Sequence, residues 1–82
     1  MIRIAMADDD EVFLKKIEKY VEKYQGEHGE EIETTLFSDA KELIEGYTPR
    51  FDIIILDIEM PGLNGMEAAE QIRQVDENVV LM

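Results

Sequence analysis

The sequence predicts an α/β protein with a flavodoxin-like, doubly wound parallel sheet in the partial order β-α-β-α-β-α-β. Short apolar or alternating segments at residues 2–7, 31–37, 51–56 and 79–82 have the length and composition of strands. Segments with apolar residues at helical spacing separate them. Because strands that alternate with helices are joined by right-handed crossovers, we expect helices on both faces of one parallel sheet.

The first strand alternates apolar with other side chains and is expected to end at about Ala7. Asp9 or Asp10 is suited to cap the following helix, which is predicted over residues 10–25. The apolar face of that helix consists of Leu14, Ile17, Val21 and Tyr24, with Phe13 and Tyr20 at its margins. Gly26 and Gly29 are expected to end the helix in a turn.

The second strand contains several β-branched residues, which favour extended structure. Ser38 is expected to cap a short second helix that Gly46 and Pro49 close. The apolar residues of that helix are Ala40, Leu43, Ile44 and Tyr47. The third strand is apolar apart from Asp52, a composition typical of a strand buried on both faces of a parallel sheet.

Residues 57–65 contain Pro61, Gly62 and Gly65 and are predicted to form a loop. A third helix is expected to follow, and its apolar residues are Met66, Ala69, Ile72 and Val75. The fourth predicted strand, residues 79–82, completes the alternation. The length of 82 residues allows one small domain.

The composition excludes several classes of function. With 20 acidic and 8 basic residues the formal net charge is −12, which disfavours binding to nucleic acid or to anionic membranes. The chain has no cysteine for a disulfide or a thiolate metal site. The longest apolar run is too short to span a bilayer, and the N-terminus lacks the pattern of a signal peptide. A soluble cytoplasmic domain is therefore expected.

Acidic residues follow two of the predicted strands. Asp8, Asp9 and Asp10 come directly after the first strand, and Asp57 comes directly after the third. In an open parallel sheet, ligands bind at the carboxyl ends of the strands, where the strand order reverses. Considered singly, Asp9 or Asp10 could serve only as a helix cap, and Asp57 could only begin a turn. Their joint placement at two neighbouring strand ends favours a ligand-binding site.

Carboxylates held together repel one another, and a cation between them allows them to stay ionised. Their hard oxygen ligands select Mg²⁺ or Ca²⁺, and Mg²⁺ commonly binds one or two carboxylates together with phosphate oxygens. A carboxylate beside such a metal can act as a nucleophile toward a phosphoryl group and form an aspartyl-phosphate. His28, between two turn glycines, is expected to be exposed and not a ligand.

Two segments resemble the receiver domains of bacterial two-component response regulators. Residues 4–10 read Ile-Ala-Met-Ala-Asp-Asp-Asp, similar to the first strand and acidic pair of that family. Residues 51–67 read Phe-Asp-Ile-Ile-Ile-Leu-Asp-Ile-Glu-Met-Pro-Gly-Leu-Asn-Gly-Met-Glu, which is close to its phosphorylation-site signature. The second motif is specific, and the resemblance extends over the whole chain.

The resemblance implies a role for each matching residue. Asp57 matches the phosphoacceptor, and Asp8 and Asp9 match the acidic pair that binds Mg²⁺. Glu59 matches the position whose backbone carbonyl completes the Mg²⁺ shell. Asp10 is the alternative to Asp8 in the pair, and counting from the strand favours Asp8 and Asp9.

The implied function is that of a phosphoacceptor module, not a turnover enzyme. A histidine kinase would transfer a phosphoryl group to Asp57 with Mg²⁺ and thereby regulate an output, expected to be transcription, in the full-length protein. The signature is also similar to that of regulators with a LytTR-type DNA-binding output. Receivers carry a Ser or Thr after the fourth strand and a Lys after the fifth, and neither has a counterpart here. Residues 1–82 thus correspond to the N-terminal part of a receiver domain, before its fifth strand.

Strand-end carboxylates also occur in proteins with two other functions. Aspartate-dependent phosphohydrolases resemble hydrophobic-Asp-x-Asp-x-Thr, whereas Asp57-Ile-Glu-Met-Pro has neither the second Asp nor the Thr. A vestigial, non-catalytic assembly fragment is the other alternative. A homo-oligomer is also expected, because no fifth helix is available to cover the sheet beside the first helix. Val79 and Leu81 are expected to lie on the open edge of the fourth strand.

Overall fold

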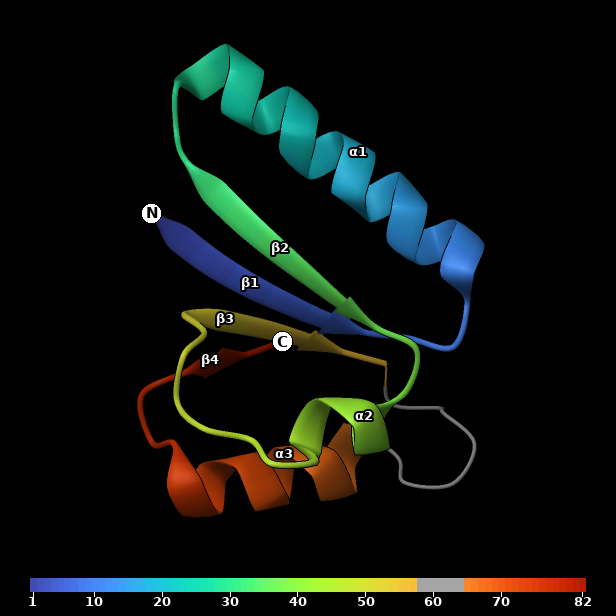
Figure 1. Ribbon diagram of the computed structural model, residues 1–82, viewed down its shortest axis with the longest axis vertical. Coiled ribbons are helices and arrows are strands. Elements are labelled where there is room, and N and C mark those ends of the chain that lie inside the picture. Colours follow the sequence, from blue (N-terminus) through green and yellow to red (C-terminus); the bar gives the residue numbers. More distant parts are fainter. Residues whose placement is uncertain (58–64) are drawn as a thin grey trace.

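A computed structural model describes residues 1–57 and 65–82. In these residues, four strands alternate with three helices (Figure 1). The elements in order are β1 (Ile2–Ala7), α1 (Glu11–His28), β2 (Ile32–Phe37), α2 (Ala40–Ile44), β3 (Ile53–Leu56), α3 (Gly65–Val75) and β4 (Val80–Leu81). The predicted alternation of strand and helix is confirmed.

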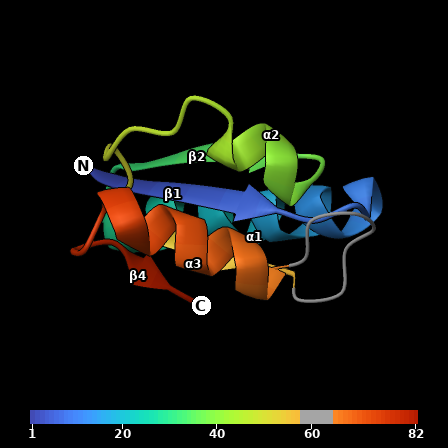
Figure 2. The ribbon, with the colours of Figure 1, turned by 90° about the horizontal axis from the view of Figure 1, so that it is seen from below.

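The strands form one parallel sheet in the order β2-β1-β3-β4. Figures 1 and 2 show α1 on one face of this sheet and α2 and α3 on the other. The order reverses direction at β1, because the chain goes outward to β2 and then returns past β1 to β3. This is the strand order of flavodoxin-like folds, and it confirms the predicted fold class.

The core lies mainly between the sheet and the two helices α2 and α3. Leu43 of α2, Ile54 of β3 and Ile72 of α3 are its largest fully buried side chains. On the opposite face, Leu14 is the one residue of α1 that is buried. Because β1 and β3 run parallel, their carboxyl ends lie at the same end of the sheet.

Helix α1 begins where predicted and ends three residues later than predicted. Asp10 is its N-cap, and the helix continues through Gly26 to His28. A single glycine inside a helix costs only about 1 kcal/mol, so Gly26 does not end it. Gly29, with φ of 69°, is the C-cap, and its N–H donates to the carbonyl of Gln25 at 2.9 Å. His28 is exposed, as expected, and stacks on Tyr24.

The cap of α2 differs from the prediction. Asp39 and not Ser38 is the N-cap, since the Glu42 N–H donates to Asp39 Oδ1 at 2.7 Å. Ser38 instead donates its hydroxyl proton to Glu42 Oε2 at 2.8 Å. The helix ends at Ile44, so Tyr47 lies beyond it.

The buried face of α3 also differs from the predicted one. Gly65, Ala68 and Ile72 are its buried residues, whereas Met66 and Val75 are 61% and 56% exposed. The buried stripe thus follows i, i+3 and i+7 from Gly65, and Ala68 and Ile72 of this stripe belong to the hydrophobic core. Val79, expected on the open edge, is instead buried in the core.

A buried carboxylate joins the segment that follows α2 to the segment between α3 and β4. Tyr47 Oη donates to Asp76 Oδ2 at 2.7 Å, and the N–H groups of Asn78 and Val79 donate to Asp76 Oδ1 at 3.3 Å. Asp76 is the one buried charged residue among those described. Burial raises the pKa of Tyr47 above its ordinary value of 10, and the Asp76 carboxylate raises it further.

This hydrogen bond predicts a loss of stability at alkaline pH. A raised tyrosine pKa means that the neutral phenol stabilises the folded state fully below pH 10, and this contribution falls as the pH rises above it. Tyr47→Phe should lower the free energy of unfolding at pH 8 by about 1 to 3 kcal/mol. It should also make the free energy of unfolding depend less on pH between pH 9 and 11. Urea titrations at several pH values measure both, with the exposed Tyr20→Phe as the control. An equal alkaline slope in Tyr47→Phe and the parent would contradict this role.

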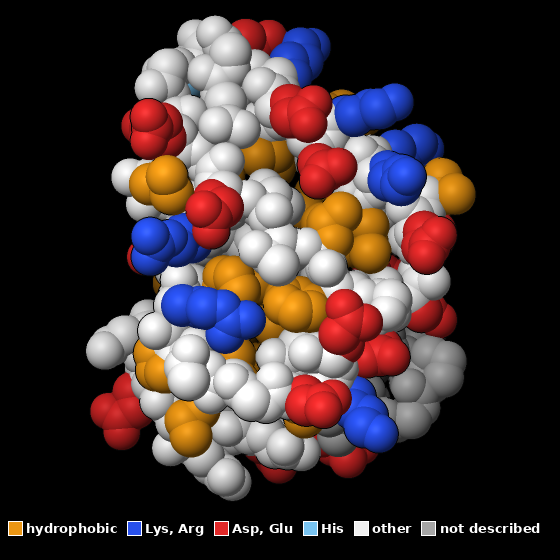
Figure 3. Space-filling model, in the orientation of Figure 1, with side chains coloured by type: hydrophobic (Ala, Val, Ile, Leu, Met, Phe, Trp, Pro, Cys, Tyr) orange, Lys and Arg blue, Asp and Glu red, His pale blue; other side chains and the backbone are white. Residues whose placement is uncertain are grey.

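The surface is acidic but mixed. Figure 3 shows acidic side chains scattered over one face, with Lys and Arg side chains among them. Among the described residues, no helix has the length and apolar composition needed to span a membrane.

Candidate metal centre

The pairing of β1 with β3 brings two acidic segments together. Ala7 and Leu56, the last residues of the two strands, are register partners. Beyond them, the Asp57 N–H donates to the carbonyl of Ala7 at 3.1 Å, and the Asp8 N–H donates to the carbonyl of Phe37 at 3.2 Å. The backbones of Asp8 and Asp57 are therefore fixed by the sheet before their side chains are considered.

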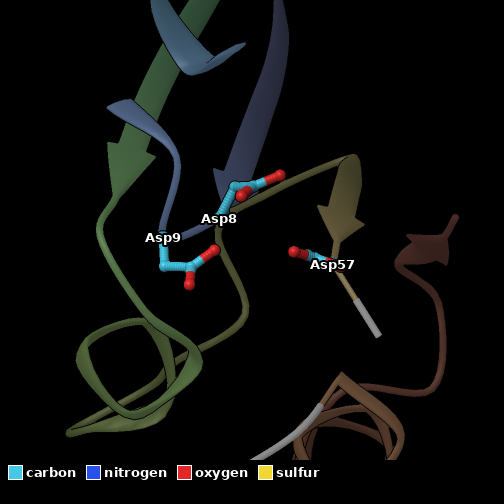
Figure 4. A group of neighbouring side chains, drawn as sticks. All are labelled: Asp8, Asp9 and Asp57. Carbon is cyan, nitrogen blue, oxygen red and sulfur yellow. The ribbon is translucent and has the colours of Figure 1, made fainter. Parts of the chain in front are cut away.

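The side chains of Asp8, Asp9 and Asp57 converge at this end of the sheet (Figure 4). One carboxylate oxygen of each lies within 4.8 Å of the others. Asp8 and Asp57 are partly buried and Asp9 is exposed. The structure thus places these three predicted residues together, from segments 48 positions apart in the chain.

Asp10 lies next to the cluster in sequence but turns toward α1. Its Oδ1 accepts hydrogen bonds from the N–H groups of Val12 at 3.0 Å and Phe13 at 3.1 Å. Of the two alternatives, Asp8 lies in the cluster with Asp9 and Asp57, while Asp10 caps the helix.

The surroundings of Asp8 disfavour its ionised form. Burial raises the pKa of Asp8, and the nearby carboxylates of Asp57 and Asp9 raise it further. The hydrogen bond that the Asp10 N–H donates to Asp8 Oδ1, at 2.9 Å, acts in the opposite direction. A cation bound between the carboxylates would remove the repulsion.

The donor set fits a hard divalent cation. Carboxylate oxygens are the ligands that Mg²⁺ and Ca²⁺ prefer, and three of them approach closely enough to share one ion. Among the described residues, this is the one group of His, Asp or Glu side chains with such spacing. The fourth predicted ligand, the backbone carbonyl of Glu59, lies outside the described residues.

An apolar hollow of about 320 Å³ lies beside the cluster, between α1 and the sheet. Its lining residues are Met6, Ala7, Asp8, Phe13, Leu14, Ile17, Ile55, Leu56 and Asp57. Asp8 and Asp57 are the acidic residues of this lining, and the other seven residues are hydrophobic. The hollow lies beside α1, where uncovered apolar surface was expected.

Taken together, the sheet order and the cluster define a doubly wound α/β domain with an acidic site at the switch point of its strands. Residues 4–82 match the family model of the response regulator receiver domain. The chain belongs to this family. No protein among the curated sequences matches it significantly.

Solved structures agree with this assignment. The non-phosphorylated HemR receiver domain from Leptospira biflexa superimposes with a TM-score of 0.83 at 23% identity, covering 99% of this chain and 61% of that one. Response regulator TrrA from Thermotoga maritima, in complex with Mg²⁺ and BeF, has a TM-score of 0.74 at 32% identity and covers 99% and 66%. The complex of histidine kinase ThkA with TrrA matches with a TM-score of 0.67, the same identity and the same coverage.

The chain is shorter than these neighbours. It spans 61%, 55% and 62% of the first three solved chains that it matches. The structural similarity nevertheless covers 96% to 99% of this chain.

Proposed function

We propose that the chain is a phosphoacceptor module of two-component signal transduction, with Asp57 as the phosphorylated residue. The main support is the cluster of Asp57 with Asp8 and Asp9 at the carboxyl ends of β1 and β3, in which one carboxylate oxygen of each residue lies within 4.8 Å of the others. Membership of the receiver family supports the same role. The module accepts one phosphoryl group and is not a turnover enzyme.

The geometry suits an attack by the Asp57 carboxylate on a phosphoryl group. An oxygen of Asp57 would form the new O–P bond, while the bond from phosphorus to the donor breaks and its electron pair leaves with the donor. If the donor is a phosphohistidine, that leaving group is the imidazole nitrogen. Asp8 and Asp9 would hold Mg²⁺, with the backbone carbonyl of Glu59 as a further ligand. When bound, Mg²⁺ neutralises charge on the transferring group.

Two of the similar solved structures support a cofactor and a partner for this chain. TrrA, 32% identical to this chain, was solved with Mg²⁺ and BeF and also in complex with a histidine kinase. We therefore propose Mg²⁺ as the cofactor and a histidine kinase as the phosphodonor, in the cytoplasm. Regulation of transcription and a LytTR-type output stay predictions.

Mass spectrometry tests this function. Incubation with Mg²⁺ and a small phosphodonor such as acetyl phosphate should add one phosphoryl group, and peptide mapping should locate it on Asp57. Steady release of phosphate from a phosphomonoester would favour the phosphohydrolase alternative. A chain that neither binds Mg²⁺ nor gains a phosphoryl group would be the vestigial fragment.

The expected homo-oligomer also stays a prediction, supported by the hollow beside α1. Phe13 at its rim is 45% exposed, and Tyr20 and Tyr24 continue the exposed aromatic surface along the helix. The net charge of −12 opposes association, so the dimer should strengthen as salt screens the charges. Sedimentation equilibrium of the 82-residue chain at low and moderate salt measures this. A monomer at high micromolar concentration under both conditions would refute it.

A further inference from the structure

The three consecutive aspartates of this chain have different surroundings. Asp8 and Asp9 belong to the carboxylate cluster, whereas Asp10 binds the backbone of α1. Asp10 nevertheless contacts both the carboxylate cluster and helix α1. Its side chain accepts two N–H groups of the first helical turn, and its own N–H donates to Asp8 Oδ1 at 2.9 Å. One residue therefore links the start of the helix to a side chain of the candidate metal centre.

These contacts fix the path of the chain through the site. The first N–H groups of a helix have no partner within it, so the Asp10 side chain determines where α1 begins. The carbonyl of Asp10 also accepts the first helical hydrogen bond, from the Leu14 N–H at 3.1 Å. Asp9 lies between this fixed point and Asp8, whose N–H is held by β2. The backbone of Asp9 is thus held from both sides.

We propose that Asp10 is a positioning residue of the metal centre, which orients Asp8 and Asp9 without binding the ion itself. This inference rests on the proposed function, because it assumes that the cluster binds Mg²⁺. The carboxylate of Asp10 is engaged by the helix N-terminus, where a negative charge is also favourable. Loss of the cap frees the turn that carries Asp8 and Asp9, and the carboxylates move apart under their mutual repulsion.

Isothermal titration calorimetry with Mg²⁺ alone tests the proposal on the parent chain and on matched variants. Asp10→Ala removes the acceptor and should weaken Mg²⁺ binding by about tenfold or more, as outer residues of metal sites commonly do. Asp10→Ser keeps a capping oxygen without the charge, and it should restore most of the affinity. Asp39→Ala removes the equivalent cap of α2, outside the cluster, and should leave the Mg²⁺ affinity unchanged.

A second variant covers the case in which Asp10→Ala does not fold. Asp10→Gly lacks the side-chain oxygen but costs a helix start little stability, and its affinity should fall as in Asp10→Ala. In the metal-free protein, amide hydrogen exchange should show faster exchange at Val12 and Phe13 in both variants.

The outcomes separate this inference from the proposed function. If the parent binds Mg²⁺ and either the Ala or the Gly variant binds equally well, Asp10 has no positioning role and the proposed function stands. If Asp10→Ser binds as weakly as Asp10→Ala, the charge of Asp10 and not its cap matters, and the inference is overturned. If the parent does not bind Mg²⁺ at all, both fall together.

Discussion

Asp57→Asn should abolish covalent phosphorylation while leaving the fold intact. The amide has nearly the shape of the carboxylate, so the hydrogen bond from the Asp57 N–H to Ala7 and the pairing of β1 with β3 should persist. An amide oxygen is a far poorer nucleophile than a carboxylate oxygen, so phosphoryl transfer should stop. Incubation with acetyl phosphate and Mg²⁺, followed by intact-mass measurement, should show complete phosphorylation only in the parent.

The control for this experiment is another aspartate that follows a strand. Asp39→Asn keeps the cap of α2, because Asn caps helices as well as Asp does, and lies outside the carboxylate cluster. It should accept a phosphoryl group at the rate of the parent chain. Equal incorporation by Asp57→Asn and the parent would exclude Asp57 as the acceptor. A circular dichroism spectrum unchanged from the parent would show that the fold is retained.

The fold could be predicted from the sequence because its signals were local and agreed with one another. Each strand was marked by its length and apolar composition, and the alternation with helices then determined a parallel sheet. The acidic cluster followed from the same topology, since residues after adjacent parallel strands must lie near each other. The close approach of Asp8, Asp9 and Asp57 needed no information beyond the two strand ends.

The errors arose where two residues competed for one local role. Ser38 and Asp39 are both good caps, and only the backbone geometry places Asp39 at the helix start. On α3, the apolar spacing of Met66 and Val75 was as regular as that of the buried residues. Packing into the core instead buried Ala68 and Ile72, while Met66 and Val75 stayed exposed. Tertiary contacts therefore decided between patterns that the local sequence left equivalent.

The hydrogen bond of Tyr47 to Asp76 could not be predicted, because it joins residues 29 positions apart in sequence. Neither residue belongs to a motif, and an aspartate before a strand usually only begins a turn. The burial of Asp76 depends on how the segments around α2, α3 and β4 pack together. Such contacts depend on tertiary packing, not on local sequence patterns.

Mg²⁺ should stabilise the folded chain strongly. Burial and the nearby carboxylates of Asp57 and Asp9 raise the pKa of Asp8, so its ionisation costs stability as the pH rises through the raised value, and at neutral pH the metal-free fold bears this cost. A bound divalent cation reverses this effect. At a Mg²⁺ concentration 100 times the dissociation constant, the gain is about 2.7 kcal/mol. For a domain of this size, the melting temperature should rise by roughly 10 to 20 °C.

Thermal unfolding followed by circular dichroism, with millimolar Mg²⁺ or with a chelator, measures this shift. Asp8→Asn should melt higher than the parent chain in the chelator, because it removes one repelling charge, and it should gain much less from Mg²⁺. Glu22→Gln, which removes an exposed charge on α1, should respond to Mg²⁺ as the parent does. This contrast separates binding at the cluster from general screening of the net charge of −12. Equal shifts in Asp8→Asn and Glu22→Gln would show that Mg²⁺ acts only through screening, and that the three carboxylates do not form a metal site.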